Sequence, residues 1–208
     1  MSSLSIEKII PPLIPYVTVG IGLLLFRNAW IAILSYHAGM IAVILTAENR
    51  ISLKQTCRNN KARFLFIALF AGAIAGALFY LLRPYFSIPD DIGSYIMSIG
   101  LTEQTWPVFL VYFSIVNPPL EEYYWRGLLA SDSTRITVND VLFSGYHLIV
   151  LAGRIDIIWL AAVFLCLTAG AWFWRQINRL NGGLLASAVS HFTADILIIL
   201  TIYSVAIN

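Results

Sequence analysis

The sequence predicts an all-α, polytopic membrane protein with about seven transmembrane helices around a polar cavity inside the membrane. Of its 208 residues, 59% are hydrophobic and 12% are charged, about half the charged fraction of an average soluble domain. The apolar residues form long blocks, which is typical of helices that cross a bilayer. A transmembrane β-barrel would instead show short segments of alternating hydrophobicity. We expect a single integral membrane domain over residues 1–208.

The apolar blocks define seven expected spans, in chain order 9–26, 29–47, 64–82, 106–130, 140–151, 157–174 and 182–207. The first is expected to begin at Pro11 or Pro12, because proline is tolerated in the first turn of a helix. The third is rich in glycine and alanine over residues 71–77, which lets a neighbouring helix approach closely. A short helix within 92–101 is expected to lie at the membrane interface. Tryptophans near helix ends, Trp174 among them, are interpreted as interface anchors.

Lysine and arginine are divided unevenly between the connecting loops. With seven spans and a cytoplasmic amino terminus, the inside loops 48–63, 131–139 and 175–181 hold eight of these residues and the outside loops hold three. This bias obeys the positive-inside rule. We therefore expect a protein of the inner or plasma membrane with a cytoplasmic amino terminus. Its partners would be membrane lipid and a membrane-tethered peptide or protein substrate, and no nucleic acid.

Ionisable side chains inside the expected spans are the candidates for function, because a charge at mid-bilayer costs roughly 2.5–3.5 kcal/mol. Glu121 and Glu122 are neighbours, so they point about 100° apart on a helix. Glu122 and Arg126 are four residues apart with the acid first, which is the favourable order for an ion pair. Glu121 would then be free to accept a proton. The alternative is that the three residues form only a buried salt-bridge cluster or a polar collar at the membrane surface.

Three histidines and one further acid complete the candidates. His147 lies four residues after Phe143 on one helical face, although a single histidine in a membrane helix is often a hydrogen-bonding strut. His191 and Asp195 are also four residues apart and can reach one point. That spacing suits two metal ligands or a histidine oriented by a carboxylate, and the alternative is an internally satisfied pair. His37 has no charged partner within a helical turn and is interpreted as structural.

Glu121, His147, His191 and Asp195 belong to three separate expected helices. Together they are sufficient to activate a water molecule and to stabilise an oxyanion. The same four side chains are also candidate ligands for a divalent metal ion such as zinc. Both arrangements are typical of hydrolytic enzymes. The prolines at 118–119 predict a broken or kinked helix that admits water to the adjacent carboxylate.

The order and spacing of these residues resemble the CPBP intramembrane proteases, which include the type II CAAX prenyl endopeptidases and bacteriocin-processing or immunity proteins. The three motifs are Glu-Glu-x-x-x-Arg at 121–126, Phe-x-x-x-His at 143–147 and His-x-x-x-Asp at 191–195. Each motif falls on its own apolar segment. The resemblance covers residues 108–204, and we expect a protease-like core over about 106–207.

The resemblance implies an intramembrane endopeptidase that cleaves a membrane-associated or lipidated, CAAX-like peptide. By analogy, Glu121 and His147 activate the attacking water, whereas His191 and Asp195 hold the oxyanion. The residues implied to support the site are Glu122, Arg126 and Phe143. CAAX endopeptidases usually carry asparagine where this chain has Asp195. A carboxylate there favours a metal site, hence a metalloprotease, or a bacterial-type variant, and makes prenyl-protein substrates less secure.

Two other functions compete with proteolysis. The first is a non-proteolytic membrane scaffold or bacteriocin-immunity protein with the same fold. The second is a transporter or channel that uses the carboxylates as a relay, although the lack of internal repeats and the small number of spans count against it. A protease requires Glu121, His147 and His191 to converge beside a water-accessible cavity, whereas a scaffold does not.

Overall fold

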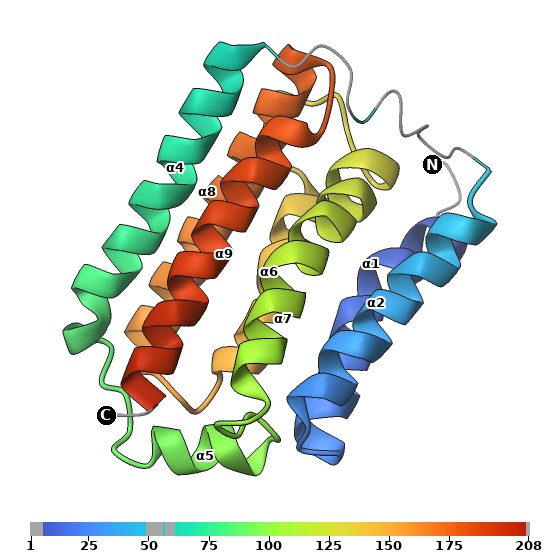
Figure 1. The fold of residues 1–208 in the computed structure, drawn as a ribbon. Helices are drawn as coiled ribbons and strands as arrows, with labels where there is room; N and C mark the ends of the chain where they lie inside the picture. The colour runs from blue at the N-terminus through green and yellow to red at the C-terminus, as the bar shows by residue number, and fades with distance from the viewer. Residues whose placement is uncertain (1–5, 49–55, 57–60, 207–208) are drawn as a thin grey trace.

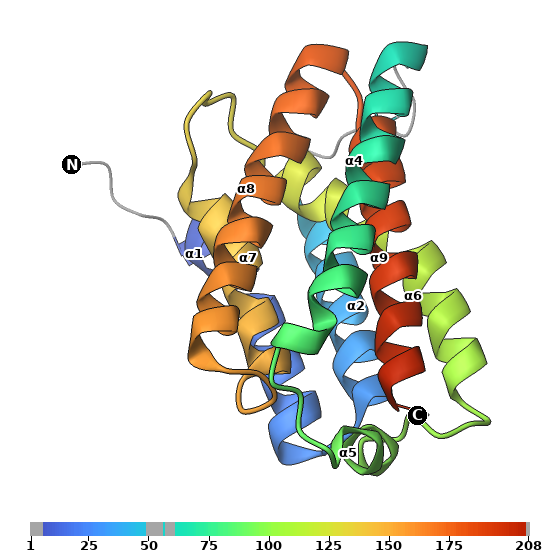
Figure 2. The same cartoon turned by 90° about the vertical axis from the view of Figure 1, so that its left-hand side faces the viewer.

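A computed structural model describes residues 6–48, 56 and 61–206 of the chain. Within these ranges the regular structure is entirely helical, which confirms the predicted fold class. The long helices run up and down beside one another, and the short helix α5 lies across one end of the bundle (Figures 1 and 2). Four of the helices are long and apolar enough to cross a membrane, as expected for an integral membrane protein.

The helices have the following bounds in chain order: α1 (Ile6–Gly20), which continues as a π-helical segment (Ile21–Leu25), α2 (Ala29–Thr46), α4 (Ala62–Leu82) with a 3-10 turn (Arg83–Tyr85), α5 (Ile92–Ser98), α6 (Trp106–Glu121), which continues as a second π-helical segment (Glu122–Leu128), α7 (Val138–Leu151), α8 (Ile157–Asn181) and α9 (Leu185–Ala206). The four helices of membrane-spanning length are α2, α4, α8 and α9. The expected total of seven spans therefore stays a prediction. The short helix expected within residues 92–101 is present as α5, and its position at the membrane interface stays a prediction.

Helices α4 and α9 pack side by side along their length (Figure 1). Glycines on α4 make this possible: a Cβ atom added to Gly72 would lie 2.2 Å from the backbone oxygen of Ser190, and one added to Gly76 would lie 2.4 Å from Cβ of Leu197. Small residues at a membrane helix interface let two backbones approach. The glycine- and alanine-rich stretch thus has the packing role predicted for it.

The first helix starts earlier than predicted. It begins at Ile6, not at Pro11 or Pro12, and it carries both of these prolines and Pro15 inside it. Each proline lacks an N–H group, so a carbonyl of the preceding turn loses its helical partner. A side chain from another element satisfies one backbone oxygen in this region, since the Tyr124 hydroxyl donates to the carbonyl of Pro11 at 2.7 Å.

Of the two forms predicted for the helix at residues 118–119, broken or kinked, the structure contradicts the break. Helix α6 continues through Pro118 and Pro119 to Glu121, and the chain then widens into the π-helical segment. The N–H of Glu122 donates to the carbonyls of both prolines, which helps the helix to persist. Single π-helical turns inside α-helices are frequent at functional sites, and here the change of winding begins at Glu122, directly after Glu121.

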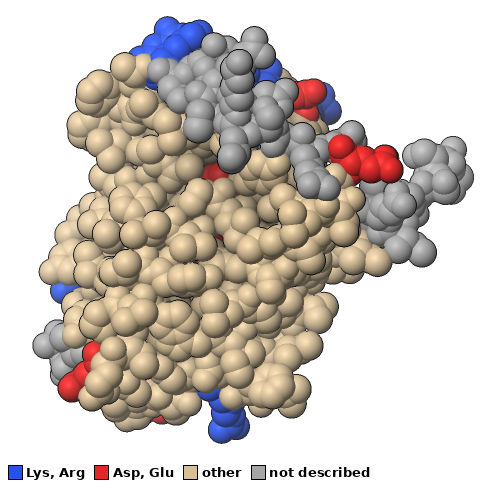
Figure 3. All heavy atoms as spheres, turned by 45° about the vertical axis from the view of Figure 1, so that its right-hand side comes forward, with Lys and Arg blue, Asp and Glu red and all other residues tan. Residues whose placement is uncertain are grey.

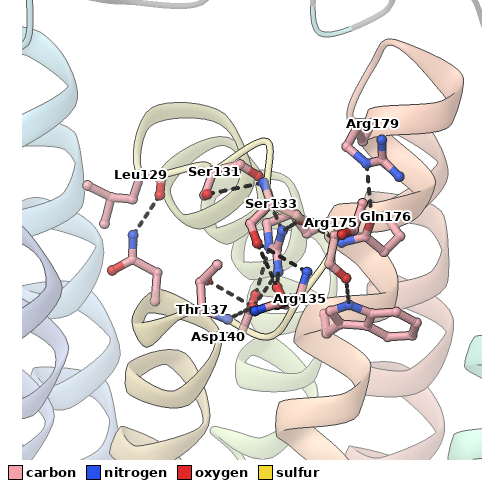
Figure 4. A network of polar contacts seen from close by, with 12 residues as sticks. Leu129, Ser131, Ser133, Arg135, Thr137, Asp140, Arg175, Gln176 and Arg179 are labelled. Atoms are coloured by element: carbon pink, nitrogen blue, oxygen red, sulfur yellow. Dashed lines mark hydrogen bonds and ion pairs between the residues drawn. The ribbon is translucent and has the colours of Figure 1, made fainter.

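Helix α8 does not end at Trp174, as the basic residues after it suggested, but at Asn181, where Gly182 follows with a left-handed φ of +78°. Arg175 is buried in this extension. Its guanidinium binds both carboxylate oxygens of Asp140, with Nη2 2.6 Å from Oδ2 and Nε 3.1 Å from Oδ1 (Figure 4). The Arg175 side chain of α8 can be buried because a buried acid on α7 neutralises its charge.

The same guanidinium holds the loop between the second π-helical segment and α7. Arg175 donates to three backbone carbonyls of that loop, those of Ser131, Ser133 and Arg135 (Figure 4). The cap of the next helix, α7, is Thr137, in a capping box with Asp140. Asp140 therefore serves the helix cap and the ion pair together.

Charged side chains gather toward the two ends of the face shown in Figure 3, and its middle is mostly uncharged. Such a band suits contact with lipid hydrocarbon. Arg50, Lys54 and Arg58, which contributed to the predicted orientation, lie outside the described residues. The orientation of the chain in the membrane therefore stays a prediction.

Candidate intramembrane active site

Glu121 lies at the end of α6 with a fully buried side chain. One carboxylate oxygen, Oε1, accepts hydrogen bonds from the hydroxyls of Tyr36 on α2, at 2.7 Å, and Tyr146 on α7. The Trp125 indole N–H donates in turn to the Tyr36 hydroxyl at 3.0 Å. The other oxygen, Oε2, has no hydrogen-bond partner within the described residues and faces Nε2 of His191 at 3.4 Å. Glu121 therefore accepts hydrogen bonds through one oxygen, while the other contacts His191 within the described residues.

Glu122 forms the predicted ion pair. Its Oε1 lies 3.1 Å from Nη1 of Arg126, and the same oxygen lies 3.1 Å from Nδ1 of His191. The side chains of both Glu122 and Arg126 are almost completely buried. A buried charge that loses its partner costs several kcal/mol, so the Glu122–Arg126 pair stabilises the π-helical segment. The contact of Glu122 with His191 connects this segment to α9.

Aromatic rings surround the Arg126 guanidinium. Its Cζ atom lies 3.9 Å from the ring centroid of Phe143 and 5.0 Å from that of Trp174. Attraction between a desolvated cation and aromatic faces is worth about 2 kcal/mol. Trp174 also stacks on the His191 ring, with centroids 4.5 Å apart and an interplanar angle of 19°. The prediction that Trp174 anchors the chain at the membrane interface was therefore wrong, because it is buried in the site.

His191 is the side chain that joins the site together. Through Nε2 it faces Oε2 of Glu121 at 3.4 Å and Oδ1 of Asp195 at 3.5 Å, and through Nδ1 it binds Glu122. Asp195 lies one turn further along α9, as the spacing of the motif predicted. Its other oxygen accepts a hydrogen bond from Nδ2 of Asn117 at 3.3 Å. One imidazole thus bridges three carboxylates from two segments of the chain.

His147 lies beside this group. Its Nδ1 hydrogen-bonds to the backbone carbonyl of Phe143 at 2.9 Å, which leaves Nε2 for another partner. The ring packs on Tyr146 with centroids 4.1 Å apart, and it interacts electrostatically with Glu121 and His191. His147 is only partly buried. It therefore lies between the buried acid and the surface of the helix bundle.

The structure thus brings the four predicted catalytic residues into one neighbourhood, with Glu121 and His191 at its centre. Asp195 and His147 are its partly exposed members, the side chain of Asp195 being 15% exposed. Two larger hollows lie elsewhere, one of about 440 Å³ between α4 and α9 and one of about 550 Å³ along α6, both lined almost entirely by apolar side chains. The polar cavity expected around Glu121 therefore stays a prediction.

The arrangement of these side chains does not fit a metal site, which was one of the two alternatives considered from the sequence. No group of three or more histidine, cysteine or acidic side chains in the described residues is placed to hold a metal ion. The physical reason is that the donors face one another: both nitrogens of His191 are directed at carboxylates, and Glu121 is held by two tyrosines. A metal ligand needs its lone pair directed at the ion.

Several residues of the site were missed by the sequence analysis. Asn117 could have been found, because it lies four residues before Glu121 on the same helical face. Tyr146 directly precedes His147 and could also have been considered. Tyr36 and His37 carry no signal in the sequence, because α2 is distant from the motifs and only tertiary packing brings it there. His37, interpreted as structural, contacts Asn117 at 3.1 Å.

Buried carboxylates and histidines on the helices of an apolar bundle define an integral membrane protein with a polar site between its helices. Residues 103–197, just under half of the chain, match the family model of type II CAAX prenyl endopeptidase Rce1-like proteins. This match confirms the resemblance to the CPBP/CAAX protease family that was predicted from the motifs, and it indicates a CAAX-type protease. No curated protein and no solved structure matches the chain significantly.

Proposed function

We propose that this protein is an intramembrane endopeptidase that hydrolyses a peptide bond of a membrane-associated or lipidated, CAAX-like peptide. The proposed core is residues 106–207, in a cell membrane with the amino terminus on the cytoplasmic side. One observation carries the proposal: Glu121 accepts hydrogen bonds through one carboxylate oxygen, while the other accepts none within the described residues and lies 3.4 Å from Nε2 of His191. A buried acid with one oxygen that accepts no hydrogen bond is suited to act as a general base.

In the proposed reaction, a water molecule lies between Oε2 of Glu121 and Nε2 of His147. The carboxylate takes one proton from this water, and the resulting hydroxide attacks the carbonyl carbon of the scissile peptide bond. His147 orients the water as it loses the proton. The proton held by Glu121 then passes to the amide nitrogen as the C–N bond breaks, which restores the carboxylate.

The negative oxygen of the tetrahedral intermediate requires a positioned donor, and His191 is proposed to supply it through its Nε2–H group. The Oδ1 atom of Asp195 lies 3.5 Å from the same nitrogen, and this contact is proposed to keep the imidazole ring beside the reacting groups until the substrate carbonyl takes its place. Donors placed in advance for an oxyanion in a water-excluded site lower the activation barrier strongly, because they need no reorganisation during the reaction. Glu122 and Arg126 support the site because they hold Nδ1 of His191, with Phe143 beneath the guanidinium.

The substrate assignment rests on the family match and on the position of the cluster. The reacting groups lie between apolar helices, and the partly exposed members, His147 and Asp195, mark the side from which substrate and water would approach. A peptide tethered to the membrane by a lipid or an apolar segment is already concentrated at such a site. Tethering therefore lowers the entropic cost of binding.

The proposal is tested with purified protein reconstituted in lipid vesicles and offered a quenched-fluorescent prenyl-peptide and a set of bacterial pro-peptides. Glu121→Gln keeps the size of the side chain but removes the base, so cleavage is expected to fall by roughly 10²–10⁴-fold. The matched control is Glu103→Gln, the same change at an exposed turn, which is expected to leave the rate unchanged. Cleavage is also expected to survive a chelator, because the donors do not fit a metal ion.

The rival candidate is a membrane scaffold with the same fold. One observation favours it: the side chains of Glu121 and Glu122 are 0% exposed, as in a structural ion cluster. Failure of folded wild-type protein to cleave any peptide of the set would favour the scaffold, as would full activity of Glu121→Gln. Loss of cleavage on chelation would show that a metal ion takes part and would contradict the hydrogen-bonded arrangement of the donors.

A further inference from the structure

Helix α2 lies outside the residues that match the family model, yet it delivers a histidine to the site. His37 is 3% exposed and Asn117, on α6, is also 3% exposed. We propose that His37 and Asn117 are positioning residues that hold the Asp195 carboxylate in place beside His191. This inference rests on the proposed peptidase function, because Asp195 and His191 are its oxyanion-stabilising pair.

The contacts form a continuous chain from α2 to α9. The Tyr112 hydroxyl lies 2.7 Å from Nδ1 of His37, and Nε2 of His37 lies 3.1 Å from Oδ1 of Asn117. Nδ2 of Asn117 lies 3.3 Å from Oδ2 of Asp195, whose Oδ1 faces His191 at 3.5 Å. Each link joins a different pair of side chains, so the position of Asp195 depends on α2 through Asn117.

The chemistry of these groups determines which one donates and which one accepts in each hydrogen bond of the series. An ionised carboxylate only accepts hydrogen bonds, so Asn117 must donate to Asp195 through its NH₂ group. The carbonyl of Asn117 then faces His37, whose Nε2 must carry a proton in order to donate to it. In a neutral imidazole Nδ1 is then an acceptor, and the Tyr112 hydroxyl donates to it. Every polar atom along this chain has a partner of the right kind.

The consequence for the site is that Asp195 cannot turn away from His191. A partly exposed carboxylate without Asn117 would be free to rotate toward water. With one oxygen held by the amide, the other is presented to Nε2 of His191. At metal sites, removing a side chain that orients a ligating histidine typically lowers metal affinity or activity by 10–100-fold, and we expect an effect of the same order for a histidine oriented through Asp195.

The first test uses the reconstituted protein and measures kcat and KM separately. Asn117→Leu keeps the size of the side chain without its amide and is expected to lower kcat by roughly 10–100-fold with KM little changed. His37→Phe is expected to lower kcat by about 3–10-fold, and His37→Gln, which can still donate to Asn117, to recover most of that loss. Met40→Leu, a buried apolar change one turn further along α2, is the packing control and is expected to keep the wild-type rate.

A double-variant cycle separates positioning from general packing. If His37 acts through Asn117, then His37→Phe adds nothing to Asn117→Leu, whereas independent structural effects would multiply. Equal fold-losses from His37→Phe in the wild-type and Asn117→Leu backgrounds would overturn the proposal. Full kcat in Asn117→Leu would overturn it as well.

A spectroscopic measurement tests the chain independently of any substrate. Infrared spectra of the aspartate-labelled protein give the carboxylate band of Asp195, assigned by its loss in Asp195→Asn. Asn117→Leu and His37→Phe are expected to shift this band, and Met40→Leu is not; an unshifted band in Asn117→Leu would refute the chain. If the band shifts as expected while wild-type protein cleaves nothing, the hydrogen-bond chain stands and the proposed function, with the catalytic role of the chain, is what fails.

Discussion

The ion pair between Arg175 and Asp140 allows the strongest test of the fold. Arg175→Met removes a guanidinium that is 4% exposed and binds an equally buried carboxylate through two contacts. Removing one partner of a buried pair costs about 3–5 kcal/mol. The same change removes the donor to three loop carbonyls. Counting one of these hydrogen bonds as not replaced by water adds about 1 kcal/mol. The expected loss of unfolding free energy is therefore about 4–6 kcal/mol.

The measurement is reversible unfolding in mixed micelles of a mild detergent and dodecyl sulfate, followed by helical circular dichroism. The matched control is Arg179→Met, the same change one turn later in α8, where the side chain is exposed and its described hydrogen bond is to Gln176. This control is expected to cost less than about 0.5 kcal/mol. Arg175→Lys keeps the charge but not the two-point geometry and is expected to lie between the two.

The reasoning would be refuted if Arg175→Met were no less stable than Arg179→Met. A second result bears on the mechanism of the loss. Asp140→Asn combined with Arg175→Met no longer leaves a buried charge without its partner, so the double variant is expected to be more stable than the sum of the two single losses by at least about 1 kcal/mol. Simple additivity would mean that the two side chains do not act as a pair.

Two further predictions concern helix packing and the site. Gly72→Val places a branched side chain against the backbone of α9 and is expected to cost at least about 1–3 kcal/mol of unfolding free energy. At Gly170 an added Cβ meets nothing within 4 Å, so the control Gly170→Ala is expected to stabilise the protein by about 0.5–1 kcal/mol. Equal stabilities of the two variants would contradict the close packing of α4 on α9. Tyr36→Phe and Tyr146→Phe each remove one donor to Glu121 and are each expected to lower peptide cleavage by about tenfold, so unchanged rates in both would contradict its positioning by tyrosines.

Local spacing predicted those parts of the site that lie within one helical turn. Glu122 and Arg126 pair at 3.1 Å, as a separation of four residues with the acid first indicates. His191 and Asp195 reach one point for the same reason, with 3.5 Å between Nε2 and Oδ1. Such contacts depend on helix geometry alone, so the spacing of residues in a short stretch of sequence is enough to predict them.

The predictions from the sequence were wrong where a side chain is buried against a partner from another helix. Arg175 was assigned to a basic loop because a charge without a visible partner requires water, but Asp140 of α7 supplies the compensating charge. Trp174 was assigned to the membrane interface because it lies near a predicted helix end, but its ring contacts Arg126 and His191 inside the site. In both cases the missing information was the identity of a distant neighbour.

By itself, the sequence determined that the chain is a helical membrane protein, and it located the three motifs that carry the candidate chemistry. The reason is that bilayer thickness and helical periodicity act on consecutive residues. Only the tertiary structure decided that Glu121 is held by Tyr36 and Tyr146 and that α2 reaches Asp195 through Asn117. These contacts join residues far apart in the chain, and they form because buried polar groups must find partners wherever packing places them.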